Sequence, residues 1–311
     1  MTTTTSAARL AARTLLTLAL AATLAPTSRA QTASPWGAPD GAKATGKYAD
    51  VNGIKLYYEV HGTSAAGQAP LVLLHGGLGA GSMFGPNIAA LAKGRQVILV
   101  DLQGHGRTAD IDRPITPELM ADDISALLTH LKVGQADVMG YSLGGGVALN
   151  TAARHPEQVH RLVLVSTVLR PDGFYPEMRT LQKAVNGSIA EQMKGTPMYA
   201  LYKSVAPRPQ DFPRLLDKLG AFMRADFDYT PQLASVKAPT LLVIGDGDMV
   251  MPAHAVEAFA VLDGGKRDGG WDGAGRSKRG QLAVLPGLTH YTIFDAPALA
   301  EVAGRFLDAK P

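Results

Sequence analysis

Six short runs of apolar residues, separated by stretches with a helical pattern, constrain the fold of this chain most strongly. Val, Leu and Ile dominate these runs, which lie within 70–77, 96–106, 136–142, 161–167, 239–248 and 281–290. Strands without polar alternation are typical of a parallel sheet that helices cover on both faces. Helical patterns occur at about 82–93, 117–131, 143–155, 253–262 and 296–308. The sequence therefore predicts an α/β fold with a mostly parallel, doubly wound sheet.

Three segments depart from this alternation. "YADVNGIKLYYEVHG" (48–62) predicts two antiparallel strands that turn at Asn52-Gly53. About seventy residues, 168–238, separate two predicted strands where a simple crossover needs far fewer. Residues 263–280 are rich in glycine and basic residues around Trp271. We expect this last segment to be a mobile surface insertion.

The N-terminus has the pattern of an export signal. Arg9 and Arg13 precede an apolar run, 14–25, that is short for a membrane span, and Ser28-Arg29-Ala30 offers small residues at a cleavage site. We therefore expect residues 1–30 to be a signal peptide cleaved after Ala30, which would make the mature protein periplasmic or secreted. An uncleaved amphipathic anchor is the alternative.

The remaining chain is predicted to be a linker and one domain without net charge. Residues 31–46 mix Ala, Gly, Pro and Ser and are expected to be a flexible linker, followed by a domain over 47–311. The formal charge of the whole chain is +3, and the first thirty residues hold three arginines and no acidic residue, so 3 − 3 leaves zero. This balance gives no electrostatic reason to expect nucleic acid, or a membrane after signal cleavage, as a partner. The sequence leaves the oligomeric state open.

Residue types exclude several kinds of site. The chain has no cysteine, which excludes disulfides, cysteine metal sites and a thiol nucleophile. Its histidines lack the spacing of metal ligands, and no glycine-rich loop has the lysine of a nucleotide-binding loop. No metal and no cofactor are therefore expected.

Ser142 stands among four glycines in "VMGYSLGGGV" (138–147), directly after an apolar run. Glycine weakens both strands and helices, so this clustering needs a reason. Residues 140–144 match G-x-S-x-G, the strained strand-to-helix turn that exposes a nucleophilic serine. The turn also lies at the carboxyl end of a strand, and the helix that begins there favours negative charge on a nearby oxygen. Ser142 is therefore the candidate nucleophile.

A serine nucleophile needs a base that is oriented by an acid, and in this fold the acid and then the histidine follow the serine. His254 and His290 are the histidines that come after a plausible acid. We expect His290, directly past a strand, to be the base, and His254 to be a surface or helix-start residue. His75 and His105 precede the serine, and we expect them to hold a loop and a turn.

The acid is expected after the strand at 239–248. Asp246 and Asp248 both lie there, and we prefer Asp248 because it reaches further into the loop. Asp246 is expected to serve the turn through hydrogen bonds to the backbone. If both were structural, Asp172 would be the fallback.

Two backbone amides are expected to form an oxyanion hole, which stabilises negative charge on the substrate oxygen. One belongs to Leu143, just after the nucleophile. The other is expected from "HGGLG" (75–79), where Gly77 is our choice and Leu78 the alternative.

The segments "HGG", "DLQGHGR", "GYSLGG", "GDGD" and "GLTH", in this order, resemble the α/β-hydrolase family. The resemblance covers about 48–309 and implies a serine hydrolase with Ser142 as nucleophile, His290 as base and Asp248 as orienting acid. The serine separates the chain from dehalogenases and epoxide hydrolases of the same fold, whose nucleophile is Asp. The resemblance also implies that 168–238 is a cap over the active site.

The cap sequence bears on the substrate. Methionine and aromatic side chains make adaptable apolar walls, which suggests a medium-sized hydrophobic or aromatic acyl group, although most of them are expected to pack the cap onto the core. They are Phe174, Tyr175, Met178, Met193, Met198, Tyr199, Tyr202, Phe212, Phe222, Met223, Phe227 and Tyr229.

The activity expected from these features is that of an exported serine hydrolase. Its small-molecule substrates would be carboxylic esters with small to medium hydrophobic acyl groups. Alternatives on the same triad are a lactonase, an amidase and a hydrolase of carbon–carbon bonds in aromatic ring-cleavage products. A hydrolase-like receptor with slow turnover and a cofactor-free perhydrolase are further alternatives.

Overall fold

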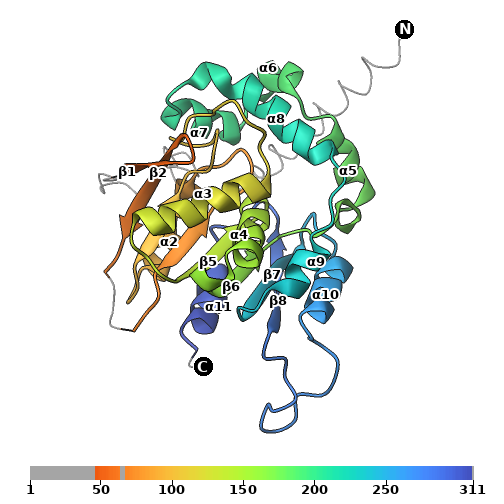
Figure 1. The fold of residues 1–311 in the computed structure, drawn as a ribbon. Coiled ribbons are helices and arrows are strands. Elements are labelled where there is room, and N and C mark those ends of the chain that lie inside the picture. The colour runs from red at the N-terminus through yellow and green to blue at the C-terminus, as the bar shows by residue number, and fades with distance from the viewer. Residues whose placement is uncertain (1–45, 64–66, 310–311) are drawn as a thin grey trace, which may run out of the picture.

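A computed structural model describes residues 46–63 and 67–309, which contain an eight-stranded sheet (Figure 1). The strands lie in the order β1-β2-β4-β3-β5-β6-β7-β8. Their bounds are β1 Lys47–Val51, β2 Ile54–His61, β3 Leu71–Leu74, β4 Val97–Val100, β5 Ala136–Tyr141, β6 Val159–Val165, β7 Thr240–Gly247 and β8 Gly280–Thr289. β2 pairs antiparallel with β1 and with β4, and the other neighbours pair parallel. The predicted α/β fold, opened by a hairpin at Asn52-Gly53, is confirmed.

The N-terminal predictions fall largely outside this part of the chain. The predicted signal peptide, 1–30, and the predicted linker, 31–46 apart from Gly46, are not among the described residues. Within the two described ranges, no helix is both long enough and apolar enough to cross a membrane.

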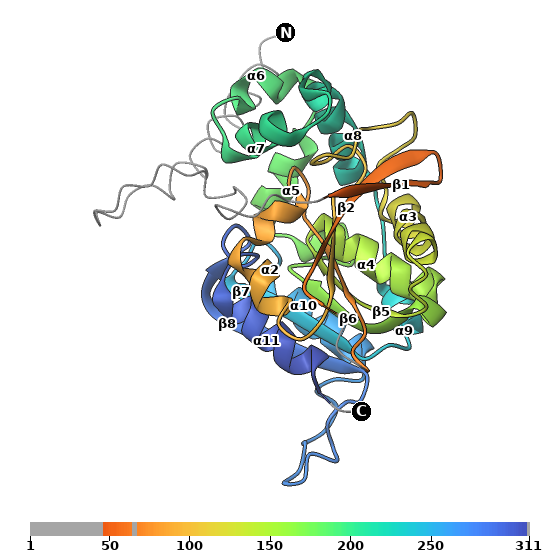
Figure 2. The same ribbon diagram turned by 90° about the vertical axis from the view of Figure 1, so that its left-hand side faces the viewer.

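Helices cover both faces of the sheet because the strands are apolar on both. Val72 and Leu74 of β3 pack in a core with α3 (Pro117–His130) and α4 (Leu143–Arg154), whereas Leu71 and Leu73 pack in a core with α2 (Pro86–Leu91) and α11 (Pro297–Leu307). Alternate residues of a strand point to opposite faces, so each strand serves both cores. Figure 2 shows α2 and α11 on one side of the strands and α3 and α4 on the other.

One predicted helix differs from the structure. The pattern at 82–93 predicts a single helix, but a short 3-10 helix, Gly81–Phe84, precedes α2. Gly85 separates the two with a φ of 48°, a left-handed conformation that interrupts a helix and that glycine adopts readily.

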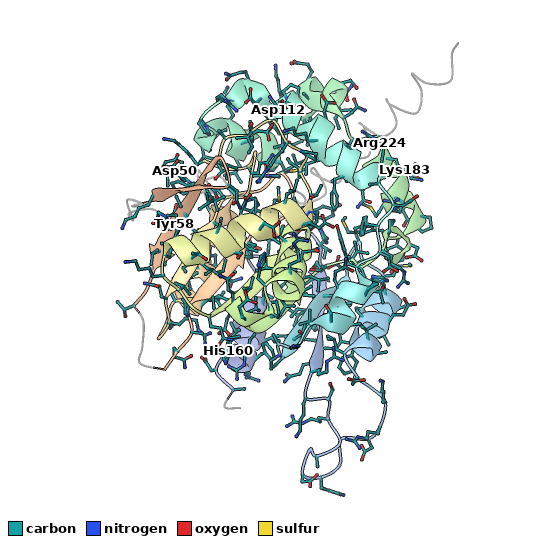
Figure 3. The ribbon with its side chains drawn as sticks, in the orientation of Figure 1. Asp50, Tyr58, Asp112, His160, Lys183 and Arg224 are labelled. Carbon is teal, nitrogen blue, oxygen red and sulfur yellow. The ribbon has the colours of Figure 1, made fainter. Side chains whose placement is uncertain are left out.

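The residues between β6 and β7 form five α-helices with two different roles. α5 (Pro176–Lys183), α6 (Ala190–Met193), α7 (Pro197–Val205) and α8 (Phe212–Arg224) lie beyond one edge of the sheet, and we call them the cap (Figure 1). α9 (Thr230–Ser235) instead packs against α4 and α10 (Pro252–Val261), beside the sheet. The cap lies at the carboxyl edge of the parallel strands. Figure 3 shows Asp112, on the loop after β4, beside the cap helices, and His160, near the start of β6, far from them.

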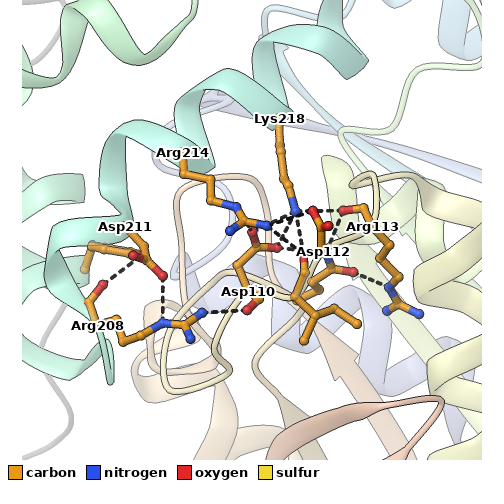
Figure 4. A network of polar contacts seen from close by, with 10 residues as sticks. Asp110, Asp112, Arg113, Arg208, Asp211, Arg214 and Lys218 are labelled. Atoms are coloured by element: carbon orange, nitrogen blue, oxygen red, sulfur yellow. Dashed lines mark hydrogen bonds and ion pairs between the residues drawn. The ribbon is translucent and has the colours of Figure 1, made fainter.

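Ion pairs join the cap to the loop after β4 (Figure 4). The side chain of Asp110 is only 2% exposed, and its Oδ2 forms ion pairs with two side chains of α8. Lys218 Nζ lies at 2.7 Å and Arg214 Nε at 2.8 Å from this oxygen. Arg208 donates to the backbone oxygen of Asp110 at 2.6 Å, and Lys218 also donates to the backbone oxygens of Ile111 and Arg113. Three cations of the cap therefore converge on one core loop.

The glycine-rich segment 263–280 connects α10 to β8. It projects from the end of the molecule opposite the cap (Figure 1) and carries the fully exposed Trp271. Backbone hydrogen bonds within it include Gly275 N to Gly269 O at 2.9 Å.

Candidate active site

Ser142 connects β5 to α4 in a conformation that few residues with a side chain adopt. Its φ is 54° and its ψ is −117°, and its amide donates to Val165 O at 2.9 Å. A Cβ on Gly140 would lie 2.0 Å from Gly144 O, and one on Gly144 would lie 2.4 Å from Leu74 O. Only glycine fits at these two positions, which confirms the reason expected for the glycines beside the serine. The turn leaves Ser142 partly exposed at the carboxyl end of β5.

His290 follows β8 and lies between the serine and the acid. Its Nε2 is 3.1 Å from Ser142 Oγ, and its Nδ1 is 2.8 Å from Asp248 Oδ1. Because Nδ1 faces a carboxylate, that nitrogen carries the proton and Nε2 can accept the serine hydroxyl proton. Tyr141 OH donates to the backbone oxygen of His290 at 2.6 Å, which fixes the loop that carries the ring.

Asp248 is buried and has hydrogen bonds on both carboxylate oxygens. Oδ1 accepts from His290 Nδ1 and from the amide of Val250, the latter at 3.0 Å, while Oδ2 accepts from the hydroxyl of Ser166. Burial works to raise the pKa of Asp248, but these hydrogen bonds and the charge of His290 outweigh it, so the pKa lies below its usual value. Asp248 is therefore held as a carboxylate.

The two alternative acids lie elsewhere. Asp246 is exposed, and its Oδ1 accepts from the amide of Gly287 at 2.8 Å, which joins the ends of β7 and β8. Asp172 is also exposed and pairs with Arg170 at 3.2 Å. Neither contacts His290, so of the three aspartates only Asp248 has the geometry of the orienting acid.

His75 and His105 are buried and hold backbone turns. His75 Nδ1 donates to Gly76 O at 2.7 Å and its Nε2 accepts from the amide of Leu102 at 3.0 Å. His105 Nδ1 donates to Gln103 O at 2.8 Å. Burial lowers the pKa of His75 to about 4 and that of His105 to about 3, so both rings are neutral at pH 7. These contacts confirm the loop and turn roles expected from the sequence.

Of the surface and helix-start positions expected for His254, the structure shows the second: the residue lies in the first turn of α10 and its side chain is buried. Its Nε2 accepts from the amide of Leu169 at 2.9 Å, and its ring packs against Gly173. Burial lowers its pKa. The side chain therefore ties α10 to the chain that leads into the cap, a contact between residues 85 positions apart.

The loop 75–79 lies against the serine, as an oxyanion hole requires. A Cβ on Gly76 would lie 3.3 Å from Ser142 Cβ, and one on Gly77 would lie 4.0 Å from a side-chain carbon of Leu143. Leu143 is the first residue of α4, where amides have no acceptor within the helix. Among the described residues, no acceptor is found for the amides of Gly77, Leu78 or Leu143. These amides are available to an oxygen atom bound at Ser142.

Sequence reasoning missed Ser166, the hydroxyl that reaches Asp248. Ser166 directly follows β6, which lies between β5 and β7 in the sheet. Residues that follow neighbouring parallel strands meet at one edge, so the polar pair Ser166-Thr167 after "RLVLV" was the available signal.

No group of three or more His, Asp or Glu residues within the described ranges is placed to hold a metal ion.

Comparisons with known proteins agree with this fold. The model of the alpha/beta hydrolase fold family matches residues 69–263, well over half of the chain. A putative carbamate hydrolase, RutD, of Azorhizobium caulinodans is 29% identical over 225 residues, which are 67% of this chain and 82% of that protein.

Solved structures show the same architecture. An enol-lactonase from Burkholderia xenovorans superimposes with a TM-score of 0.61 at 25% identity, covering 84% of this chain and all of that one. A thermophilic esterase from Thermogutta terrifontis gives a TM-score of 0.64 at 24% identity, covering 86% of this chain and 98% of that one. The chain is therefore a hydrolase that belongs to the α/β-hydrolase family.

Proposed function

We propose that this protein hydrolyses small carboxylic esters through a covalent acyl-enzyme on Ser142. The observation that carries the proposal is the continuous chain of hydrogen bonds from Ser142 Oγ through His290 to Asp248, with 3.1 Å and 2.8 Å between the linked atoms. A serine activated in this way attacks acyl carbonyls.

In this proposal each step belongs to a particular atom. Ser142 Oγ attacks the carbonyl carbon while its proton passes to His290 Nε2, and Asp248 stabilises the imidazolium that forms. The carbonyl oxygen takes up the negative charge next to the amides of Leu143 and Gly77. As the tetrahedral intermediate collapses, the ester C–O bond breaks and the leaving alkoxide takes the proton from His290. Water then attacks the acyl-enzyme by the same route and regenerates the serine.

The surroundings of His290 suit an uncharged substrate. Tyr291, next to the base, is partly exposed, and its ring lies edge-on to that of His290 with 5.7 Å between the ring centres. Tyr291 OH donates weakly to the thioether sulfur of Met249 at 3.9 Å, and Met249 follows the acid. An aromatic ring and a thioether therefore flank the catalytic pair, which favours an apolar acyl or leaving group.

Carbamates are the second candidate, because the relative from Azorhizobium caulinodans is a putative carbamate hydrolase. A carbamate carbonyl would be attacked by the same serine. It is intrinsically less electrophilic than an ester carbonyl because the nitrogen lone pair donates into it.

Hydrolysis of p-nitrophenyl esters tests the proposal. The chain from Gln31 and its Ser142→Ala variant are assayed with p-nitrophenyl esters whose acyl groups range from acetyl to long-chain. Both proteins are also assayed with p-nitrophenyl carbamates. Turnover of esters that is lost in Ser142→Ala supports the proposal, and the best acyl length reports the size of the space under the cap. Turnover of carbamates alone favours the second candidate, and folded protein without activity on either series contradicts both.

We also propose that the protein acts outside the cytoplasm, on the strength of the signal pattern in residues 1–30. Expression of the full chain in a bacterium and mass spectrometry of the exported fraction test this. A mature N-terminus at Gln31 is expected, and an intact N-terminus confined to the cytoplasm would contradict it.

A further inference from the structure

The carboxylate of Asp248 is held from two sides. His290 and the amide of Val250 occupy Oδ1, and the hydroxyl of Ser166 donates to Oδ2. Ser166 Oγ is the one hydrogen-bond donor to Oδ2 within the described residues. Its side chain is buried, so water does not compete freely for this oxygen.

The backbone of Ser166 is in a conformation that serine adopts at a cost. Its φ is 51°, in the left-handed region that glycine and asparagine occupy more easily. The amide donates to Val243 O at 2.8 Å, which holds the chain in this shape beside β7. A strained residue that glycine would replace without strain points to a use for its side chain.

From these two observations we infer that Ser166 is a positioning residue for the orienting acid. Its hydroxyl fixes the rotation of the Asp248 carboxylate so that Oδ1 points at His290 Nδ1, and it favours the ionised form of the acid. Ser166 keeps its own proton throughout and touches no substrate. The inference rests on the proposed function, because it assigns a role within the same triad.

Three substitutions separate the hydroxyl from the backbone. Ser166→Gly removes the hydroxyl and relieves the positive φ, so the fold is retained. Ser166→Ala removes the hydroxyl and keeps the strain. Ser166→Asn tolerates the positive φ and supplies an amide N–H that can donate to Asp248. Thr167→Val, which removes the hydroxyl of the next residue, is the matched control.

Steady-state hydrolysis of a p-nitrophenyl ester gives the first readout. In Ser166→Gly and Ser166→Ala, kcat is expected to fall about tenfold, with KM nearly unchanged, because the loss affects orientation in the transition state. Ser166→Asn is expected to recover much of this loss, and Thr167→Val to behave like the wild type.

The pH profile gives a readout that a merely structural role would not move. The hydroxyl favours the ionised carboxylate, so without it the Asp248–His290 pair takes up protons at higher pH. The acidic limb of kcat/KM is therefore expected to move to higher pH in Ser166→Gly and to return in Ser166→Asn.

The NMR signal of the His290 Nδ1 proton gives a readout without substrate. A proton hydrogen-bonded to a carboxylate resonates far downfield, and this signal is expected to shift or broaden in Ser166→Gly but not in Thr167→Val. Wild-type kcat, pH profile and Nδ1 signal in Ser166→Gly would overturn the inference. Absence of ester turnover in the wild type, with the NMR difference present, would instead reject the proposed function and leave the positioning role supported.

Discussion

Phe174, where the chain enters the cap, forms an antiparallel bridge with Val250, whose amide donates to Asp248. Met251 N also donates to Gly173 O at 2.9 Å. The loop that carries Asp248 is therefore joined by backbone hydrogen bonds to the segment that leads into the cap. A shift at this point moves the acid as well as the cap.

Gly173→Ala is therefore expected to impair both stability and catalysis. A Cβ there would lie 2.5 Å from a methyl carbon of the half-buried Val168 and 2.6 Å from the ring of the buried His254. Overpacking of this kind costs about 1–3 kcal/mol in the free energy of unfolding. Urea unfolding and kcat measure the two effects. Gly195→Ala is the control, because nothing lies within 4 Å of a Cβ at that position, and equal behaviour of the two variants would contradict the prediction.

Ser142→Gly is expected to be more stable than Ser142→Ala. Both lack the nucleophile, but the alanine retains the strained φ of 54° and ψ of −117°. Relief of strain of about 1–3 kcal/mol, reduced by the greater freedom of glycine in the unfolded chain, leaves a gain of about 1 kcal/mol. Equilibrium urea unfolding compares the two inactive variants directly. A lower unfolding free energy for Ser142→Gly would show that the turn is not strained.

The sheet and the meeting of Ser142, Asp248 and His290 follow from local patterns. Each residue comes directly after an apolar strand, and β5, β7 and β8 lie close together in a parallel sheet, so their carboxyl ends converge. The choice between Asp246 and Asp248 depended on how far each reaches into the loop. Only the structure shows Asp246 bonded to the amide of Gly287 instead.

The features that the sequence did not predict depend on contacts between distant residues. The pattern around His254 indicates a helix start, but it does not reveal that the ring accepts from the amide of Leu169, 85 positions earlier. The hydrogen-bond partner of Ser166 is Asp248, which lies 82 positions later in the sequence. No periodicity encodes such pairs, because they depend on how separate elements pack.

Asp110→Ala is expected to destabilise the attachment of the cap. The substitution leaves Lys218, mostly buried, and Arg214, half exposed, without the carboxylate that receives both. Loss of this buried carboxylate costs about 2 kcal/mol or more in the free energy of unfolding, after allowance for the solvent around Arg214. Asp112→Ala is the matched control, since this neighbouring side chain is fully exposed and pairs with Arg214 at 3.3 Å.

A double-mutant cycle with Lys218→Met isolates the Asp110–Lys218 pair. Urea unfolding should show a smaller cost of Asp110→Ala in the Lys218→Met background than in the wild type. Additive costs would mean that the pair contributes no coupling energy.

The protein is expected to lose stability as the pH falls below about 6.5, because its buried histidines remain neutral in the folded state but become protonated in the unfolded state. The pKa of His75 is lowered to about 4 and that of His105 to about 3, whereas an unfolded histidine titrates near 6.5. Between these values the unfolded state binds protons that the folded state does not. Stability is therefore full above about pH 6.5 and declines as the pH falls toward 4, by up to about 1.4 kcal/mol per pH unit for each histidine.

His75→Gln tests the share of His75, because a glutamine oxygen can still accept from the amide of Leu102. Urea unfolding at pH 7.5, 6.5 and 5.5 is expected to show that the unfolding free energy of His75→Gln falls less steeply with falling pH than that of the wild type. The difference in slope corresponds to the uptake of up to one proton fewer on unfolding. The comparison is made relative to pH 7.5, where both states are neutral at this position and any packing defect is already included. Parallel curves for the two proteins would mean that His75 takes up its proton equally in the folded and unfolded chain, contrary to its burial.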